Sequence, residues 1–303
     1  MMPKVFRQKG CLWGGVLLMA VVCGCSRPPE LGPVANTAAL EKIRSSFGAG
    51  EGTSVDSPVA ASTGTGWATL KGRFTFVGDP PKMSPYAANK DLATCAPGGS
   101  APLQETLLVD GSTQGIANVA IFLRKSSRIH ELANLSDEPV VFDQKACRFL
   151  THVLPVGVGQ ALELKNSDGV GHNTNIEGKN SFNQTIPAGQ SLTFVPQKEE
   201  AVPQAVRCSI HPWMVAYYLP RENAYVAVTA ADGTFEIANL PAGEELEFQV
   251  WHESAAGRSG SLVLSSPAAK ELNWSNKGRI KIKLEPDEVK EIAIDVPAEA
   301  FGG

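Results

Sequence analysis

The sequence predicts an all-β protein, and three observations support this fold class. Segments in which apolar and polar residues alternate recur after residue 66, as in Trp67 to Val77 and Glu245 to His252. Segments with a helical period of apolar residues are few. Glycine and proline are abundant, at 29 and 21 residues, and many stand where turns between strands are expected. We therefore expect a fold built from strands and turns, preceded by a disordered tether.

The first 25 residues have the pattern of a secretory signal peptide. Basic residues precede an apolar segment, Leu12 to Val22, which is too short to span a bilayer comfortably. The end of this segment, Val22-Cys23-Gly24-Cys25, resembles a bacterial lipobox, which implies cleavage before Cys25 and lipidation of its sulfur. An ordinary signal peptide cut nearby is the alternative. Residues 26–66, rich in Pro, Gly, Ser, Thr and Ala, are predicted to be a flexible linker.

Composition excludes several classes of function. The net charge of -4 and the lack of a basic patch give no case for nucleic-acid binding. No Cys-x-x-Cys-His motif for haem attachment is present. No Ser/His/Asp set and no pair of carboxylates stands out as catalytic. We therefore predict that the chain is not an enzyme.

One stretch, Cys208 to Met214, combines a thiol, an imidazole and a thioether within seven residues. A mononuclear copper site for electron transfer uses one Cys, two His and a weak axial Met. Since three of these ligands occur here in order, a second histidine is expected upstream. His172 is the candidate, because it follows the alternating segment 161–165, which predicts a strand that enters a loop.

This stretch resembles the cupredoxins, the small blue-copper proteins, and its Cys-x-x-His-x-x-Met spacing is similar to the short ligand loop of amicyanin. Upstream segments also match the family pattern, namely Val158-Gly159-Gln160, Asn166-Ser167-Asp168, His172-Asn173 and Pro187-Ala188-Gly189-Gln190. The resemblance covers roughly residues 140–229. It implies a Greek-key β-sandwich with a copper site at one end.

The resemblance also implies how the metal is held. One copper ion, alternating between Cu(I) and Cu(II), would be bound by the Cys208 thiolate and by the rings of His172 and His211. Met214 would be the long axial ligand that tunes the reduction potential. This ligand set is that of a type 1 copper protein.

Neighbouring residues receive supporting roles from the same resemblance. Asn173 and Ser209 are expected to form hydrogen bonds across the two ligand-bearing loops and so to orient the ligands. Pro212 removes a backbone donor near the sulfur. Trp213, with Pro212 and Val170, is expected to surround an exposed edge of the downstream histidine ring and to form the electron-transfer surface.

Four cysteines remain after the signal peptide is removed. If Cys25 is lipidated and Cys208 binds metal, Cys95 and Cys147 are left, and export to an oxidising compartment predicts a disulfide between them. Two alternatives stay open. A Cys147–Cys208 bridge would exclude the copper site, and a second metal site could use Cys147 with His152.

Residues near the C-terminus resemble a different module. The turns Asp232-Gly233-Thr234-Phe235 and Leu240-Pro241-Ala242-Gly243 are similar to those of the carboxypeptidase regulatory-like β-sandwich, which is not catalytic. We therefore divide the chain into a cupredoxin-like domain at 67–229, with its core at 140–229, and a regulatory-like segment with a tail at 230–303. Alternatively, the strands of 67–124 pair with 225–252, with the cupredoxin inserted between them.

The predicted function is that of a lipid-anchored copper protein that carries single electrons in the bacterial cell envelope. It would face the periplasm or the cell exterior and exchange electrons with a partner protein, which the sequence does not identify. A copper-binding protein for storage or delivery, or a metal-free recognition module on the same fold, are the alternatives. A copper oxidase or nitrite reductase needs further histidine clusters, which the 5 scattered histidines of this chain do not supply.

Overall fold

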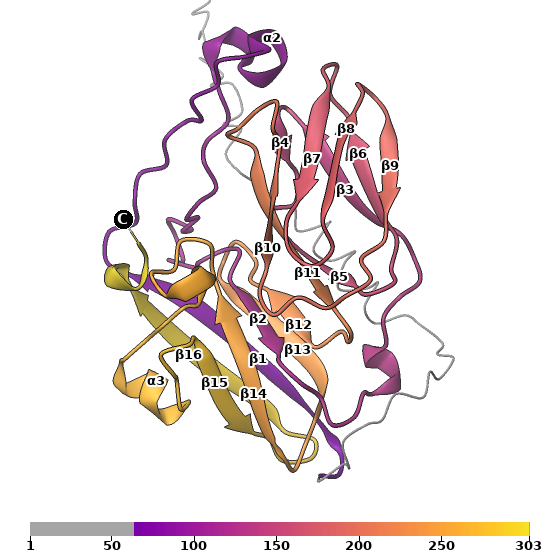
Figure 1. The fold of residues 1–303 in the computed structure, drawn as a ribbon. Helices are drawn as coiled ribbons and strands as arrows, with labels where there is room; N and C mark the ends of the chain where they lie inside the picture. Colours follow the sequence, from indigo (N-terminus) through magenta and orange to yellow (C-terminus); the bar gives the residue numbers. More distant parts are fainter. Residues whose placement is uncertain (1–63, 303) are drawn as a thin grey trace, which may run out of the picture. The chain divides into compact units, whose positions relative to one another are not determined.

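Strands dominate the computed structural model of this protein, which describes residues 64–302, and the prediction of an all-β fold is confirmed (Figure 1). Helices within the described range are short: α2 (Leu92–Cys95), α3 (Pro267–Glu271) and the single 3-10 turns Pro97–Gly99, Glu131–Ala133, Arg258–Gly260 and Ala298–Ala300. The predicted signal peptide, the lipidated Cys25 and nearly all of the linker lie outside the described residues. Between residues 64 and 302, no helix combines the length and the apolar character that crossing a membrane requires.

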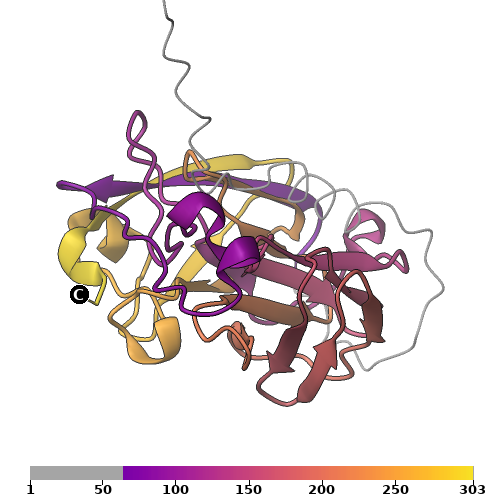
Figure 2. The ribbon, with the colours of Figure 1, turned by 90° about the horizontal axis from the view of Figure 1, so that it is seen from above.

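One sandwich, which we name the terminal sandwich, is built from strands on both sides of the chain's middle. Its two sheets are β13 (Thr234–Pro241), β1 (Trp67–Val77) and β16 (Val289–Pro297), and β12 (Val226–Val228), β2 (Ala120–Leu123), β14 (Glu245–Trp251) and β15 (Arg279–Lys283). The first and last strands, β1 and β16, run parallel and side by side (Figure 2). Apolar side chains of both sheets, such as Phe74 and Phe248, share one core.

This pairing corrects the domain division stated above. Both β1 and β2 form hydrogen-bonded ladders with strands after residue 225, as in the alternative where the middle of the chain is inserted. Residues 67–124 and 226–297 therefore make one sandwich, and the boundary between 229 and 230 does not separate domains. The alternating pattern of β1 fits any half-buried sheet, so the sequence by itself leaves its partners open.

The second sandwich, the inserted sandwich, contains the strands between β2 and β12. Its sheets have the orders β5-β11-β10-β7-β8 and β4-β3-β6-β9. The strands are β3 (Val140–Lys145), β4 (Arg148–Phe149), β5 (Val153–Gly157), β6 (Leu162–Asn166), β7 (His172–Ile176), β8 (Phe182–Ile186), β9 (Ser191–Phe194), β10 (Gln204–Arg207) and β11 (Val215–Arg221). Phe142 of β3 and Tyr218 of β11 belong to the one core that both sheets share.

A third apolar cluster joins the two sandwiches and explains why β2 is buried at all four of its residues. Ile121 and Leu123 point into the core of the terminal sandwich, whereas Ala120 and Phe122 point the other way, into a cluster with residues of β5 and β11. The buried guanidinium of Arg221 lies over the Phe122 ring and donates to the carbonyl of Leu123 at 2.7 Å. The β5–β11 edge of the inserted sandwich is therefore packed against the terminal sandwich.

Candidate metal centre

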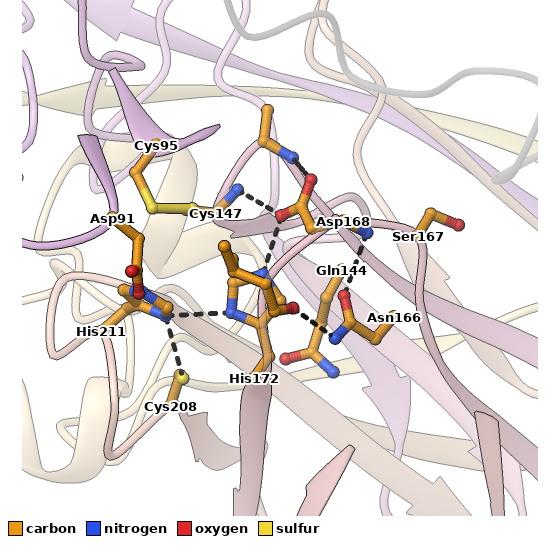
Figure 3. Close-up of polar contacts among 12 residues, drawn as sticks. Asp91, Cys95, Gln144, Cys147, Asn166, Ser167, Asp168, His172, Cys208 and His211 are labelled. Carbon is orange, nitrogen blue, oxygen red and sulfur yellow. Dashed lines mark hydrogen bonds and ion pairs between the residues drawn. A yellow bond between two sulfur atoms is a disulfide. The ribbon is translucent and has the colours of Figure 1, made fainter. Parts of the chain in front are cut away.

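Three of the four predicted ligands converge at one end of the inserted sandwich (Figure 3). His172, Cys208 and His211 each place one donor atom in this group, and the three atoms lie within 4.8 Å of one another. The two Nδ1 atoms are 3.0 Å apart, and the Cys208 sulfur is 3.8 Å from Nδ1 of His211. All three side chains are buried, with relative exposures of 0%, 1% and 0%.

Strand pairing and a tight loop bring these ligands together. His172 is the first residue of β7, which pairs with β10, and Cys208 follows directly after β10. The loop then folds back, because the Cys208 amide donates to the Met214 carbonyl at 3.2 Å and the Met214 amide donates to the His211 carbonyl at 2.9 Å. The Met214 side chain is buried in the same core as Cys208. Its role as an axial ligand remains a prediction.

The sulfur of Cys208 receives a hydrogen bond from the neighbouring strand. The main-chain N–H of Asn173 donates to Sγ at 3.2 Å, and the Asn173 side-chain oxygen accepts from the N–H of Ser209 at the same distance. The expected link between positions 173 and 209 is thus present, made through the main chain of Ser209. The side-chain NH2 of Asn173 also donates to the side-chain oxygen of Asn183, which fixes the Asn173 side chain further.

Each ligand ring also contacts a carboxylate through its outer nitrogen. Nε2 of His172 lies 2.7 Å from Asp168, and Nε2 of His211 lies 2.9 Å from Asp91. Because an ionised carboxylate only accepts hydrogen bonds, both Nε2 atoms carry the proton, and the two Nδ1 atoms are left as donors to a metal. Carboxylate partners of this kind fix the tautomer and the orientation of a ligating imidazole.

Asp168 is held by a hairpin turn. Ala146 and Cys147, the two residues that join β3 to β4, both have positive φ, at 52° and 51°. This conformation fits the twist of a two-residue hairpin but is unfavourable for residues with a side chain. Asp168 accepts from both of their N–H groups, at 2.7 and 2.8 Å. The carboxylate therefore supports the turn and His172 at once.

Sequence reasoning missed both carboxylates as contacts of the ligands. The contact of Asp168 could have been predicted from its position, since it stands four residues before His172 in the turn that resembles the family pattern. No sequence pattern marks Asp91 as a contact, because it lies 120 residues from His211 in the segment that connects β1 to β2.

The groups of this centre shift one another's pKa values. Burial alone would lower the pKa of His172, but Asp168 and the Cys208 sulfur outweigh it and raise the pKa to about 9. Burial opposes ionisation of Cys208, yet hydrogen bonds from His172 and the Asn173 amide lower the pKa of the thiol. Burial and the neighbouring His172 together lower the pKa of His211. The cysteine is thus poised to act as a thiolate, the form that binds metal.

The prediction of an exposed imidazole edge is wrong, because His211 has no exposed surface and its outer nitrogen contacts Asp91. Trp213 is half-buried, and its ring lies 5.1 Å from that of His211. Its indole N–H donates to the Cys147 carbonyl at 3.2 Å. Pro212 is exposed. The assignment of Trp213 to an electron-transfer surface remains a prediction.

The predicted disulfide between Cys95 and Cys147 is confirmed, and Cys208 is a free, buried thiol. The alternative bridge between Cys147 and Cys208 is therefore wrong. A second metal site at Cys147 and His152 is also excluded, because the sulfur is in the disulfide and the ring of His152 is bonded to Glu105 and Glu253.

The donor set fits copper. A buried thiolate and two imidazoles whose Nδ1 atoms face one another form a soft, compact site of the kind that copper prefers. The two Nδ1 atoms lie at hydrogen-bond distance, so a proton or a cation between them relieves the repulsion of their lone pairs. A bound metal ion would take the place of that proton.

Comparison with known proteins finds no matching family model and no matching curated protein. Among solved structures, the chain is similar to a reduced point mutant of amicyanin, with 17% identity over 29% of this chain and 86% of that one and a TM-score of 0.26. A purple cupredoxin from Nitrosopumilus maritimus shares 23% identity over 28% of this chain and all of its own, with a TM-score of 0.24. A copper-containing nitrite reductase from Thermus scotoductus shares 21% identity over 32% of this chain and 26% of its own, with a TM-score of 0.26. Likenesses this weak add no information about activity.

Proposed function

We propose that this protein binds one copper ion through His172, Cys208 and His211, with Met214 as the axial ligand, and that it carries single electrons. The observation that supports this proposal is the convergence of three buried donor atoms within 4.8 Å, from the residues in which the sequence shows the ligand pattern. Copper bound there supplies one-electron exchange between Cu(I) and Cu(II). The role is that of an electron carrier and not of an enzyme.

The protein's own residues perform the remaining tasks. The Asn173 N–H withdraws electron density from the Cys208 sulfur, and burial keeps water away from the ligands. His172 is fixed at the start of β7 by Asp168. Two packed sheets hold these groups in place and would limit how far they move when a bound copper ion changes its oxidation state.

The place of action proposed is the bacterial cell envelope, with the chain anchored to a membrane through lipidated Cys25 and facing the periplasm or the exterior. The signal-like pattern of residues 1–25 supports this placement. The Cys95–Cys147 disulfide fits it as well, because disulfides persist in oxidising compartments. A redox protein of the same compartment would be the partner.

Copper loading followed by spectroscopy tests the proposal. The protein should bind one copper ion per chain and show strong visible absorption from the thiolate, which ascorbate bleaches and an oxidant restores. Cys208→Ser should abolish this absorption. Ser209→Ala is the matched control, because it keeps the main-chain N–H that contacts Asn173, and it should stay coloured. Visible absorption that survives in Cys208→Ser would refute the site.

Burial of the ligands supports a second candidate, copper storage or delivery. With no exposed edge, His211 offers no direct route to a redox partner. A protein for storage or delivery would bind Cu(I), remain colourless and fail to cycle with oxidant. Failure to bind copper at all would leave the metal-free recognition module.

A further inference from the structure

Asp91 reaches the metal centre from outside the inserted sandwich. It lies in the segment between β1 and β2 of the terminal sandwich, yet its carboxylate accepts from Nε2 of His211 at 2.9 Å. Asp91 has a left-handed backbone conformation, with φ at 49° and ψ at 41°. This conformation is uncommon for residues other than glycine, and aspartate is among the few that adopt it readily.

A covalent bond holds this segment in place. The Asp91 carbonyl accepts from the N–H of Cys95 at 2.9 Å, so that α2 forms one short turn between the two residues. Cys95 is bonded to Cys147, whose own N–H donates to Asp168. The disulfide therefore links two turns (Figure 3). One contains Asp91, the partner of His211, and the other donates hydrogen bonds to Asp168, the partner of His172.

The disulfide sulfurs are also close to the ligand itself. A ring nitrogen of His211 and the sulfurs of Cys95 and Cys147 all lie within 4.8 Å of one another. His211 is consequently fully buried, although Ser209 and Pro212 in the same loop are exposed. The segment from Asp91 to Cys95, which we name the cap, thus covers the outer edge of His211.

We propose that Asp91 is a positioning residue of the metal centre. The disulfide-tied cap keeps the proton of His211 on Nε2, so that Nδ1 is free to bind the metal, and it shields the ring from solvent. Its negative charge favours the oxidised, divalent ion. This inference rests on the proposed copper site. The physical reason is that a carboxylate on the outer nitrogen makes the imidazole more basic and adds negative charge beside the metal. Both effects stabilise the higher charge of Cu(II) more than that of Cu(I).

The first test uses the metal-free full chain, so it does not depend on copper. Nitrogen NMR should show His211 as the Nε2–H tautomer in the wild type and as a mixture of tautomers in Asp91→Ala. Diethyl pyrocarbonate, with mapping of the modified sites, should modify His211 in that variant about tenfold faster or more, the factor expected for loss of one charge-assisted hydrogen bond. Asp79→Ala, an exposed position in the same connecting segment, is the control and should leave the rate unchanged.

The reactivity of a second histidine distinguishes local opening of the cap from unfolding of the whole protein. His252 is buried in the terminal sandwich, with a relative exposure of 1%. It should stay unreactive while His211 becomes reactive in Asp91→Ala. The double variant Cys95→Ser, Cys147→Ser should also expose His211, because Asp91 is then no longer tied down. Equal rates for His211 in wild type, Asp91→Ala and Asp79→Ala would overturn the inference.

The second test measures the copper-loaded protein. Asp91→Asn keeps an acceptor for Nε2 but removes the charge, so Cu(II) affinity should fall about tenfold while Cu(I) affinity stays the same. A tenfold change for one electron corresponds to a rise in reduction potential of about 59 mV. Asp79→Asn removes the same charge at an exposed position of the same connecting segment and should leave the potential unchanged.

The two tests separate the inference from the proposed function. A wild type that binds no copper would refute the copper site, whereas the tautomer and reactivity of His211 would still report on the cap. A blue wild type with an unchanged potential in Asp91→Asn would refute the role of Asp91 in tuning and leave the copper site intact.

Discussion

His152 offers a quantitative test of how the two sandwiches are held together. It precedes β5 of the inserted sandwich, and Nε2 contacts Glu253, which follows β14 of the terminal sandwich. Nδ1 lies 3.3 Å from Glu105, which is also paired with Arg148 at 3.1 Å. Burial alone would lower the pKa of His152, but the hydrogen bonds to Glu105 and Glu253 outweigh it and raise the pKa to about 9.

The sign of the pH dependence follows from this upward shift. The unfolded chain binds the proton of His152 with a pKa of about 6.5, so the folded state holds it more tightly. The stability that this proton provides is complete below pH of about 6.5 and is lost as the pH rises through about 9. Because one pKa unit corresponds to about 1.4 kcal/mol, the loss is about 3 kcal/mol.

Urea unfolding of the metal-free protein between pH of about 6 and about 10 measures this loss. His152→Gln keeps a hydrogen-bond donor at this position but cannot take up a proton, so its stability should fall about 3 kcal/mol less over that range. His172 also titrates with a pKa of about 9, and comparison of the two proteins cancels its contribution. His252, whose pKa burial and His152 lower to about 3, stays neutral throughout. Parallel pH curves for wild type and variant would refute the reasoning.

Three further predictions concern the disulfide, the metal and the contact between sandwiches. Replacing Cys95 and Cys147 by Ser should cost about 4 kcal/mol in the chain-entropy model for this loop, seen as a lower urea midpoint; an unchanged midpoint would contradict it. Copper at about a hundredfold excess over its Kd should stabilise the protein by about 2.7 kcal/mol in thermal unfolding, and Cys208→Ser should lose this gain. Arg221→Leu should cost about 3–5 kcal/mol, because its acidic partner and two carbonyl groups lose their donor. The exposed Arg207→Leu serves as its control and should cost far less.

The ligand pattern was predictable because it is local. Cys208 and His211 are fixed relative to each other by the length of one loop, and His172 begins a strand that pairs with the strand before that loop. The link between Asn173 and Ser209 follows from the same pairing, since each residue directly follows a ligand. Short-range order along the chain therefore determined the donor set.

The surroundings of the ligands were not predictable in this way. An aspartate 120 residues from a histidine carries no pattern that marks it as a contact, since acidic residues fit most exposed positions equally well. The same holds for β1, whose alternation suits several sheets until β13 and β16 are seen to pair with it. Both contacts arise only when distant segments pack together.

The all-β class and the order of the candidate ligands could be read from the sequence. The Cys95–Cys147 bridge was predicted on the premise that Cys25 is lipidated and Cys208 binds metal, and the structure confirms it. The packing of distant segments was needed to show that the ligand-bearing sandwich is inserted into another and that His211 is buried beneath Asp91. The physical reason is that alternation and spacing specify which face of a strand is buried and how far a loop reaches. Which remote segment covers that face depends on the packing of the whole chain.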